Sequence, residues 1–340
     1  MKIDILTNDG SPLSVTLEDL YGSANRVGLG GSEYGMLTLA EAWHKAGHEV
    51  VIYNDPANPN GSPWEHRAIS SFSPQDERDI LIVFRTPNER SLVAKGLKVW
   101  LSCDQYTRAD ADFRKFSGFV HKIVTISPRH KQYFEQTYGI QDSVVIDLPV
   151  RLSDLNLDVE KIPQKCIFTS VPDRGLHILH SCWGAIKSAV PSASLTITSD
   201  YRLWGVKDAR NDPHRVQWMM EKDIRFLGAI GRMELVREQL SSVLMPYPSN
   251  YDELFCVAVA EAQACGVYPV TSNTGSLSTT NMGTVLDESG NFKVKFTTAV
   301  IEKLNDPDLV SLGRELKAKA YERFSPETIL KQWDEKVFSG

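Results

Sequence analysis

The sequence predicts an α/β protein made of two domains, each built on a doubly wound parallel sheet. Short runs of β-forming residues alternate with helical stretches along most of the 340 residues. Most of these runs are apolar at nearly every position, as expected for parallel strands that are covered by helices on both faces. The alternation stops at the polar stretch 151–164 and then starts again, so we place the domain boundary there.

The first domain is expected to span residues 1–155 and to contain six strands. They are predicted at residues 3–7, 49–53, 80–84, 98–102, 122–126 and 144–148. Between the first two strands, apolar residues recur at helical spacing from Met36 to Trp43, and Gly47 ends this helix.

The second domain is expected to span residues 165–315, with strands at 166–171, 194–199, 224–228, 242–247, 267–272 and 283–286. A helical tail follows, and we expect residues 316–340 to form a final helix that crosses back to the first domain. Doubly wound sheets bind ligands beyond the carboxyl ends of their strands. Two such domains facing one another would therefore form a binding cleft between them.

The composition narrows the classes of function. A net charge of −6 provides no overall basic field, which makes nucleic acid an unlikely partner. The five cysteines show no C-x-x-C or Cys/His metal spacing, so we expect reduced thiols in a cytoplasmic protein. The first residues are expected to begin a strand and lack the apolar core of a signal peptide, and no segment approaches the run of about 18 apolar residues that a membrane span needs.

Two glutamates, Glu253 and Glu261, enclose an almost uncharged stretch that we expect to be helical over 253–264. In such a helix the two carboxylates would lie about 80° apart around the axis and about 12 Å apart along it, too far to share a proton or a metal ion. Between them lie the backbone amides of Leu254, Phe255 and Cys256, and a helix N-terminus favours anions. The pattern predicts a ligand with hydroxyls at both ends and an anionic middle, such as a nucleotide sugar.

The alternative is that these acids only stabilise the helix. Acids in a first turn favour the helix dipole, and Asn250 or Asp252 could cap it. This alternative accounts for Glu253. It does not account for Glu261, because an unpaired charge deep in a helix of Ala, Val and Cys is costly.

Residues 226–277 closely resemble the C-terminal half of family-4 retaining glycosyltransferases of the GT-B fold, whose signature is Glu-x7-Glu followed by small residues and Pro-Val. The resemblance covers most of the chain and is weaker in the first domain. It implies two Rossmann-like domains facing across a cleft. It also implies transfer of a sugar, with retention of configuration, from a UDP- or GDP-linked donor to a glycan, glycolipid or small-molecule hydroxyl, without a metal or cofactor.

The same resemblance implies roles for individual residues. Glu253 would approach the hydroxyls of the donor sugar, and Glu261 would bind the ribose of the nucleotide. The amides of Leu254, Phe255 and Cys256 would meet the diphosphate. The cleft between the domains would close on the donor. Catalysis would then come mostly from positioning of the substrates and from electrostatic stabilisation.

A second motif is the S-x-P-D-R-G-L loop that begins at Ser170 and contains Arg174 and Gly175. A cation on such a loop can neutralise the diphosphate as it leaves, which implies a catalytic role for Arg174 and a donor-binding role for Ser170. Most family members have Lys-Gly here and an arginine five residues earlier, where this chain has only Thr169 and Ser170. A surface arginine at a helix start is the alternative.

Two motifs of the first domain complete the expected site. Gly30 and Gly31 precede a long helix and resemble the family's Gly-Gly-x-Glu loop, which lines the cleft opposite the donor phosphates. They follow the first strand by about 20 residues, which counts against a dinucleotide-binding oxidoreductase. Asp104 follows a strand, where related sequences often have a His-Asp pair, and it is expected to contact donor or acceptor sugar. Loop capping is its alternative.

Two further stretches have simpler interpretations. The Asp-x-Asp within 109–112 is expected to be solvated, since a diphosphate held by Arg174 and amides needs no metal. The basic stretch 114–131 contains Phe116 and Phe119 and could contact the inner face of a membrane peripherally, although a solvated helix face is the preferred interpretation. Rival functions are a nucleotide-sugar epimerase or phosphorylase on the same fold, and a binding protein that has lost catalysis.

Overall fold

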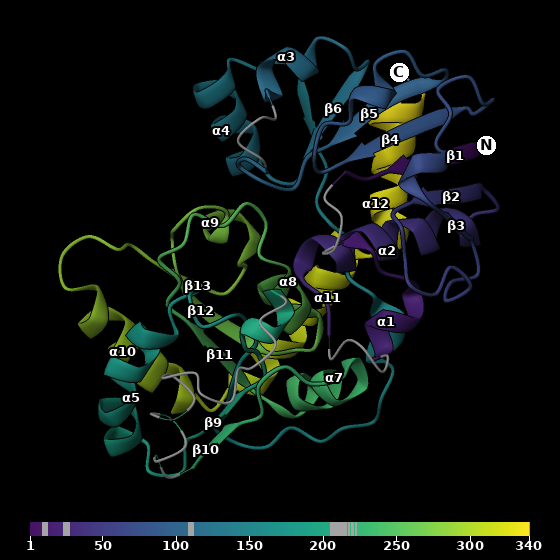
Figure 1. Ribbon diagram of the computed structural model, residues 1–340. Helices are drawn as coiled ribbons and strands as arrows, with labels where there is room; N and C mark the ends of the chain where they lie inside the picture. Colours follow the sequence, from purple (N-terminus) through teal and green to yellow (C-terminus); the bar gives the residue numbers. More distant parts are fainter. Residues whose placement is uncertain are drawn as a thin grey trace. The chain divides into compact units, whose positions relative to one another are not determined.

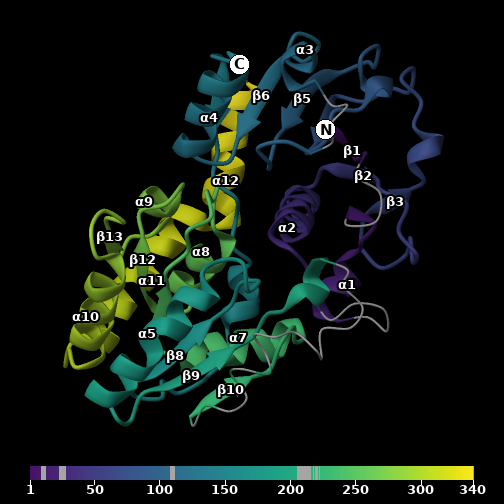
Figure 2. The same ribbon diagram turned by 60° about the vertical axis from the view of Figure 1, so that its left-hand side comes forward.

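The computed structural model describes residues 1–8, 13–22, 28–107, 112–204, 216, 218, 221 and 223–339. The chain forms two compact units. Unit 1 comprises Met1–Leu20, Leu29–Pro149 and Pro326–Gly340, and unit 2 comprises Tyr21–Gly28 and Val150–Ser325. The two units are drawn in Figures 1 and 2, and each is described by itself below.

Unit 1 is built on a seven-stranded parallel sheet with the strand order β3-β2-β1-β4-β5-β6-β7. Its strands are β1 (Lys2–Leu6), β2 (Glu49–Tyr53), β3 (Glu65–Arg67), β4 (Ile80–Phe84), β5 (Leu97–Leu101), β6 (Lys122–Thr125) and β7 (Ser143–Val145). All six expected strands are present. The sequence pattern missed β3 because this three-residue edge strand, Glu-His-Arg, has no apolar run.

The helices of unit 1 begin and end at recognisable residues. They are α1 (Leu17–Tyr21, whose last residue groups with unit 2), α2 (Gly31–Lys45), α3 (Phe113–Ser117), α4 (Pro128–Tyr138) and α12 (Pro326–Trp333), with short turns at Ile69–Ser71, Glu89–Ser91 and Asp334–Phe338. Ser127 caps α4 by accepting from the His130 amide at 3.0 Å, and Gly139 ends it at φ 70°.

The C-terminal segment from Pro326 packs within unit 1, where α12 lies against α2. The contact is made by Trp43 and Trp333, two fully buried rings in edge-to-face geometry with centroids 5.2 Å apart. The preceding helix α11 groups with unit 2, so the chain passes between the units at Ser325 rather than at residue 316. Figure 2 shows α12 in yellow beside the strands of unit 1.

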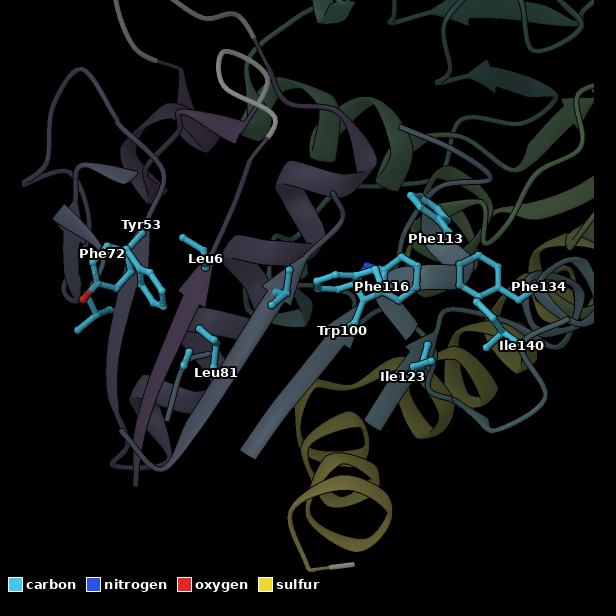
Figure 3. Close-up of a cluster of buried hydrophobic side chains, with 13 residues drawn as sticks. Leu6, Tyr53, Phe72, Leu81, Trp100, Phe113, Phe116, Ile123, Phe134 and Ile140 are labelled. Atoms are coloured by element: carbon cyan, nitrogen blue, oxygen red, sulfur yellow. The ribbon is translucent and has the colours of Figure 1, made fainter. Parts of the chain in front are cut away.

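An aromatic cluster anchors the loops on one side of this sheet. Trp100 of β5 lies 4.8 Å from Phe113 and 5.4 Å from Phe116 of α3, and 5.4 Å from Phe134 of α4, measured between ring centroids (Figure 3). The Trp100 indole N–H donates to the carbonyl of Arg85 at 3.0 Å. The cluster therefore fixes the chain where it leaves β4 and β5.

Unit 2 is built on a six-stranded parallel sheet with the order β10-β9-β8-β11-β12-β13. Its strands are β8 (Lys165–Phe168), β9 (Ser194–Ile197), β10 (Ile224–Phe226), β11 (Leu244–Tyr247), β12 (Tyr268–Ser272) and β13 (Thr284–Leu286). All six coincide with expected runs. Most buried positions of these strands are apolar, which explains why the sequence located them.

Helices cover both faces of the second sheet. They are α5 (Leu176–Ala189), α7 (Arg232–Ser241), α8 (Val257–Ala264), α9 (Leu277–Thr280), α10 (Phe292–Leu304) and α11 (Leu309–Phe324), with short turns at Leu152–Leu155 and Tyr201–Trp204. Helix α5 packs with α10 and helix α8 with α11, and β11 and β12 lie between these two pairs in Figure 1. No helix among the described residues is long and apolar enough to cross a membrane.

Candidate active site

Three loops of unit 2 meet where neighbouring parallel strands end. They follow β8, β11 and β12, which are adjacent in the sheet, and parallel strands bring such loops to one edge. Gly175, in the loop after β8, has φ +91°, and a Cβ atom there would collide with the carbonyl group of Pro248. Gly275, in the loop after β12, has φ +59°, and a Cβ atom there would collide with the backbone of Glu253. The close approach of the loops therefore requires glycine at both positions.

This packing brings together two of the three residues that we expected to be catalytic, Arg174 and Glu253; the third, Asp104, lies in unit 1. The Arg174 Nε lies 3.4 Å from Glu253 Oε1, and the two side chains are only 17% and 14% exposed. The Tyr247 hydroxyl donates to the same carboxylate oxygen at 2.9 Å. Burial raises the pKa of Glu253, and the positive charge of Arg174 opposes this rise. The site therefore holds a cation and an acid in contact in a poorly solvated environment.

Tyr247 joins several predicted residues into one network. Its side chain is fully buried, and burial raises its pKa well above the ordinary value. Its hydroxyl donates to Glu253, and the Ser170 and Cys256 side chains are close enough to influence its pKa. Ser170 thus reaches Glu253 through the phenol group of Tyr247, which sequence reasoning missed because a tyrosine ending a buried strand is ordinary core composition.

The start of helix α8 differs from the prediction. The helix begins at Val257 instead of residue 253, and Cys256 accepts its first hydrogen bonds from the amides of Val259 and Ala260, both at 3.1 Å. Glu253 is held in the loop because its carbonyl accepts from the Ser276 amide at 2.7 Å. The expected helical geometry of the two glutamates was therefore wrong.

Leu254, Phe255 and Cys256 consequently lie just before the first turn of α8. Their side chains are buried, and the Phe255 ring packs against Phe324 at 5.7 Å between centroids. Their amides stand at the end of the helix that carries the positive dipole. A role of these amides toward a diphosphate stays a prediction.

Glu261, the second predicted glutamate, has its own charge partner. The Arg232 Nη1 lies 2.6 Å from Glu261 Oε1, and Gln239 donates to Oε2 at 3.2 Å, with Glu261 only 4% exposed. The argument that its charge would require a ligand is therefore wrong, since Arg232 compensates it. Binding of a ribose by Glu261 stays a prediction.

Arg232 extends this network to Asp154. Its Nε lies 2.8 Å from Asp154 Oδ2, and Asp154 also accepts from Arg151 at 3.3 Å and from the Tyr21 hydroxyl at 2.9 Å. Burial alone would raise the pKa of Asp154, but the guanidinium groups of Arg232 and Arg151 hold it below its ordinary value. Sequence reasoning missed Arg232 because an arginine in a first helical turn is typical of a solvated position.

The predicted residues of the first domain lie in unit 1. Asp104, in the loop after β5, forms an ion pair with Arg85, which follows the neighbouring strand β4 and has φ +65°. Gly30 is the N-cap of α2 and Gly31 is its first residue. A Cβ atom at Gly30 would collide with the carboxylate of Glu33, so this glycine leaves room for an acid against the helix N-terminus. Asp104, Gly30 and Gly31 stay predicted contacts of a sugar or donor.

The two stretches with simpler interpretations can also be placed. Of the Asp-x-Asp stretch, Asp112 caps α3 by accepting from the Lys115 amide at 2.8 Å, whereas 109–111 lie outside the described residues. No cluster of possible metal ligands occurs in the described part of the chain. In the basic stretch, Phe116 is buried in the aromatic cluster, so only Phe119 could face a membrane.

Comparison with known proteins identifies the fold. No protein-family model and no curated protein matches the chain. Among solved structures, it is similar to sucrose-phosphate synthase from Thermosynechococcus elongatus, with a TM-score of 0.71, 15% identity and 99% of each chain covered. It is also similar to Anabaena HepE in complex with UDP and glucose, with a TM-score of 0.71, 16% identity and 100% of each chain covered. A third similar structure is a Rickettsia africae glycosyltransferase, with a TM-score of 0.72, 13% identity and coverage of 98% and 96%.

The chain has the GT-B fold. The predicted fold class is thereby confirmed, with one parallel sheet in each unit. Within this GT-B protein, the candidate donor-side residues Arg174, Glu253 and Glu261 all belong to unit 2. Arg174 lies in the loop after β8, Glu253 lies in the loop after β11, and Glu261 lies in the following helix α8. Doubly wound sheets bind ligands at this carboxyl edge.

Proposed function

We propose that this protein is a family-4 glycosyltransferase that moves a sugar from a nucleotide-sugar donor to a hydroxyl acceptor with retention of configuration. The observation that carries the proposal is the contact between Arg174 and Glu253 at the ends of the neighbouring strands β8 and β11. The similarity to HepE, whose structures contain UDP, UDP-glucose or UDP and glucose, supports a nucleotide sugar as the donor.

In this reaction the bond between the sugar C1 and the β-phosphate oxygen breaks, and the diphosphate takes up the negative charge. Arg174 stabilises that charge from the loop after β8, in a poorly solvated position where a cation acts strongly. The acceptor oxygen bonds to C1 on the face that the diphosphate leaves, and its proton passes to the departing phosphate. No side chain has to act as a strong base.

Glu253 would orient the donor sugar by accepting hydrogen bonds from its hydroxyls. Tyr247 and Arg174 hold the Glu253 carboxylate in a fixed place, so little reorganisation is needed when the sugar enters. Glu261 would accept from the ribose hydroxyls while Arg232 and Gln239 fix its orientation. With a cation and helix amides at the diphosphate, the transfer is proposed to need no metal.

The test is the release of nucleoside diphosphate by the purified protein without acceptor, from UDP-, GDP-, dTDP- and ADP-linked sugars. We expect slow hydrolysis of one donor, and a rate lowered about 100-fold or more in Glu253→Ala and Arg174→Ala. Binding of a donor with no turnover would instead support a binding protein, a function favoured by Thr169 and Ser170 standing where the family has an arginine. Conversion of the donor sugar to its epimer would replace the transferase proposal with an isomerase.

A further inference from the structure

Tyr251 stacks on the proposed catalytic arginine. The guanidinium carbon of Arg174 lies 3.3 Å from the centroid of the Tyr251 ring, the shortest cation–ring distance among the described residues. The Tyr251 side chain is nevertheless 41% exposed, so burial of the ring in a core does not account for its position. Tyr251 has no role in the sequence motifs or in the proposed mechanism.

The backbone on both sides of Tyr251 is fixed. Its amide donates to the Ser249 hydroxyl at 3.2 Å, and its carbonyl accepts from the Glu253 amide at 2.8 Å. Ser249 in turn accepts a hydrogen bond from Ser272 through its carbonyl, which ties the loop to the end of β12. Because the loop is held at these points, the Tyr251 ring can hold the Arg174 guanidinium in place instead of moving with it.

The stacking controls how the guanidinium can act. All five donors of an arginine lie in the plane of the guanidinium, so a ring over its face leaves their directions unchanged. In Arg174 the Nε atom lies 3.4 Å from Glu253 Oε1, and the two Nη groups lie in the same plane, beyond the guanidinium carbon. Tyr251 and Glu253 together therefore restrict the rotation of the group about its long side chain.

We propose that Tyr251 is a positioning residue that holds the Arg174 guanidinium with its edge toward the donor diphosphate. The inference rests on the proposed function, because it assigns Tyr251 a task in that reaction. Planar recognition of two phosphate oxygens depends on the orientation of the guanidinium as well as on its charge. The aromatic ring is the part of Tyr251 that does this work, and the hydroxyl is not required.

The experiment measures kcat for donor hydrolysis, with whichever donor of the four-nucleotide panel is turned over. Tyr251→Ala should lower kcat about tenfold, the effect expected when one partly desolvated cation–ring contact is lost. Tyr251→Phe keeps the ring and should recover most of that loss. In an Arg174→Ala background, Tyr251→Ala should change kcat by less than about twofold, since the two residues act as one unit.

A matched control is Tyr321→Ala in α11. It removes another contact between a cation and a tyrosine of unit 2, with Lys317 Nζ 5.4 Å from the ring centroid, far from the three loops in the sequence. This variant should keep the rate of donor hydrolysis. Thermal unfolding of Tyr251→Ala should match the wild type because the side chain is exposed.

The outcomes separate this inference from the proposed function. A full rate in Tyr251→Ala, with the rate lowered about 100-fold or more in Arg174→Ala, would overturn the positioning role and leave the proposed function standing. A tenfold loss that persists in the Arg174→Ala background would also overturn it, because Tyr251 would then act on the substrate by itself. A full rate in Arg174→Ala, or no turnover of any donor, would remove the proposed function and this inference together.

Discussion

The two units of the molecule are wound in the same way but differ in the charges at the ends of their strands. In both sheets the first strand of the unit is flanked by its second and fourth strands, so the orders β3-β2-β1-β4-β5-β6 and β10-β9-β8-β11-β12-β13 are equivalent. Unit 1 adds one more strand, β7, at an edge. The shared winding places loops at corresponding strand ends in each unit.

The charged groups at those ends are in different environments. In unit 1 the Arg85–Asp104 pair is 23% and 29% exposed, whereas in unit 2 Arg232 and Glu261 are 3% and 5% exposed. Unit 1 has a fully buried ion pair of its own, Asp4–Arg78, but this pair lies in β1 and just before β4. The common fold therefore differs between the units in the charge buried beyond the carboxyl ends of the strands. Unit 2, which buries charged groups beyond the ends of its strands, is therefore the better candidate for recognising an anionic donor.

The largest expected effect tests whether this difference in burial changes the free energy of unfolding. Arg232→Met should lower the free energy of unfolding by about 3–5 kcal/mol, because Asp154 and Glu261 would lose their buried guanidinium partner. Arg85→Met should cost less than about 1 kcal/mol, since its pair is solvated and screened. Urea denaturation of both variants would measure this, and equal losses would contradict the comparison.

A second, smaller difference between the units is expected in how much stability each loses at acidic pH. Burial lowers the pKa of His66 in unit 1 to about 4, although the nearby Asp19 opposes this, and the ring bonds Asn54 and Ser62 in its neutral form. The unfolded chain takes up this proton near the ordinary value of 6.5, so the stability that neutral His66 provides is complete above pH 6.5. It is lost as the pH falls toward 4, by at most about 3 kcal/mol.

Hydrogen exchange at pH 7 and pH 4.5 would locate this loss. Protection should fall in β2 and β3 of unit 1, and His66→Gln should reduce the pH dependence. In unit 2 the raised pKa of Glu253 acts in the opposite direction, since its ionisation costs stability as the pH rises. Equal loss of protection in both sheets would show that His66 does not set the acid sensitivity of unit 1.

Within unit 2, the two charge pairs should affect different kinetic constants. Arg174→Ala should lower kcat about 100-fold with little change in donor affinity, because its charge matters most as the diphosphate leaves. Glu261→Gln keeps the shape of the side chain and should weaken donor binding about tenfold at similar kcat. Donor titration by calorimetry and initial rates would test this division, and the same constant changing in both variants would contradict it.

The smallest effect is expected from unit 1. Asp104→Asn should lower transfer to an acceptor about three- to tenfold through loss of a charged hydrogen-bond acceptor. Arg85→Lys, which keeps the positive charge beside Asp104, serves as the matched control for the ion pair. An Asp104→Asn enzyme that transfers sugar at the rate of the wild type would show that Asp104 only caps its loop.

The sequence by itself determined the sheets and most of their strands. Runs such as 80–84 and 244–247 are apolar throughout, and a buried parallel strand is the structure that such a run can form between helices. It also picked out Arg174, Gly175 and Glu253 through local motifs, because a loop between a strand and a helix carries its signals within a few residues.

Only the tertiary structure decided how these residues are paired. Arg232 compensates Glu261, and Tyr251 stacks on Arg174, across separations in sequence that no local pattern records. The same is true of α8, whose start at Val257 depends on the Ser276 amide holding Glu253 in its loop. Contacts between distant segments exist only after the chain has packed, so their energies override the local preferences that the sequence displays.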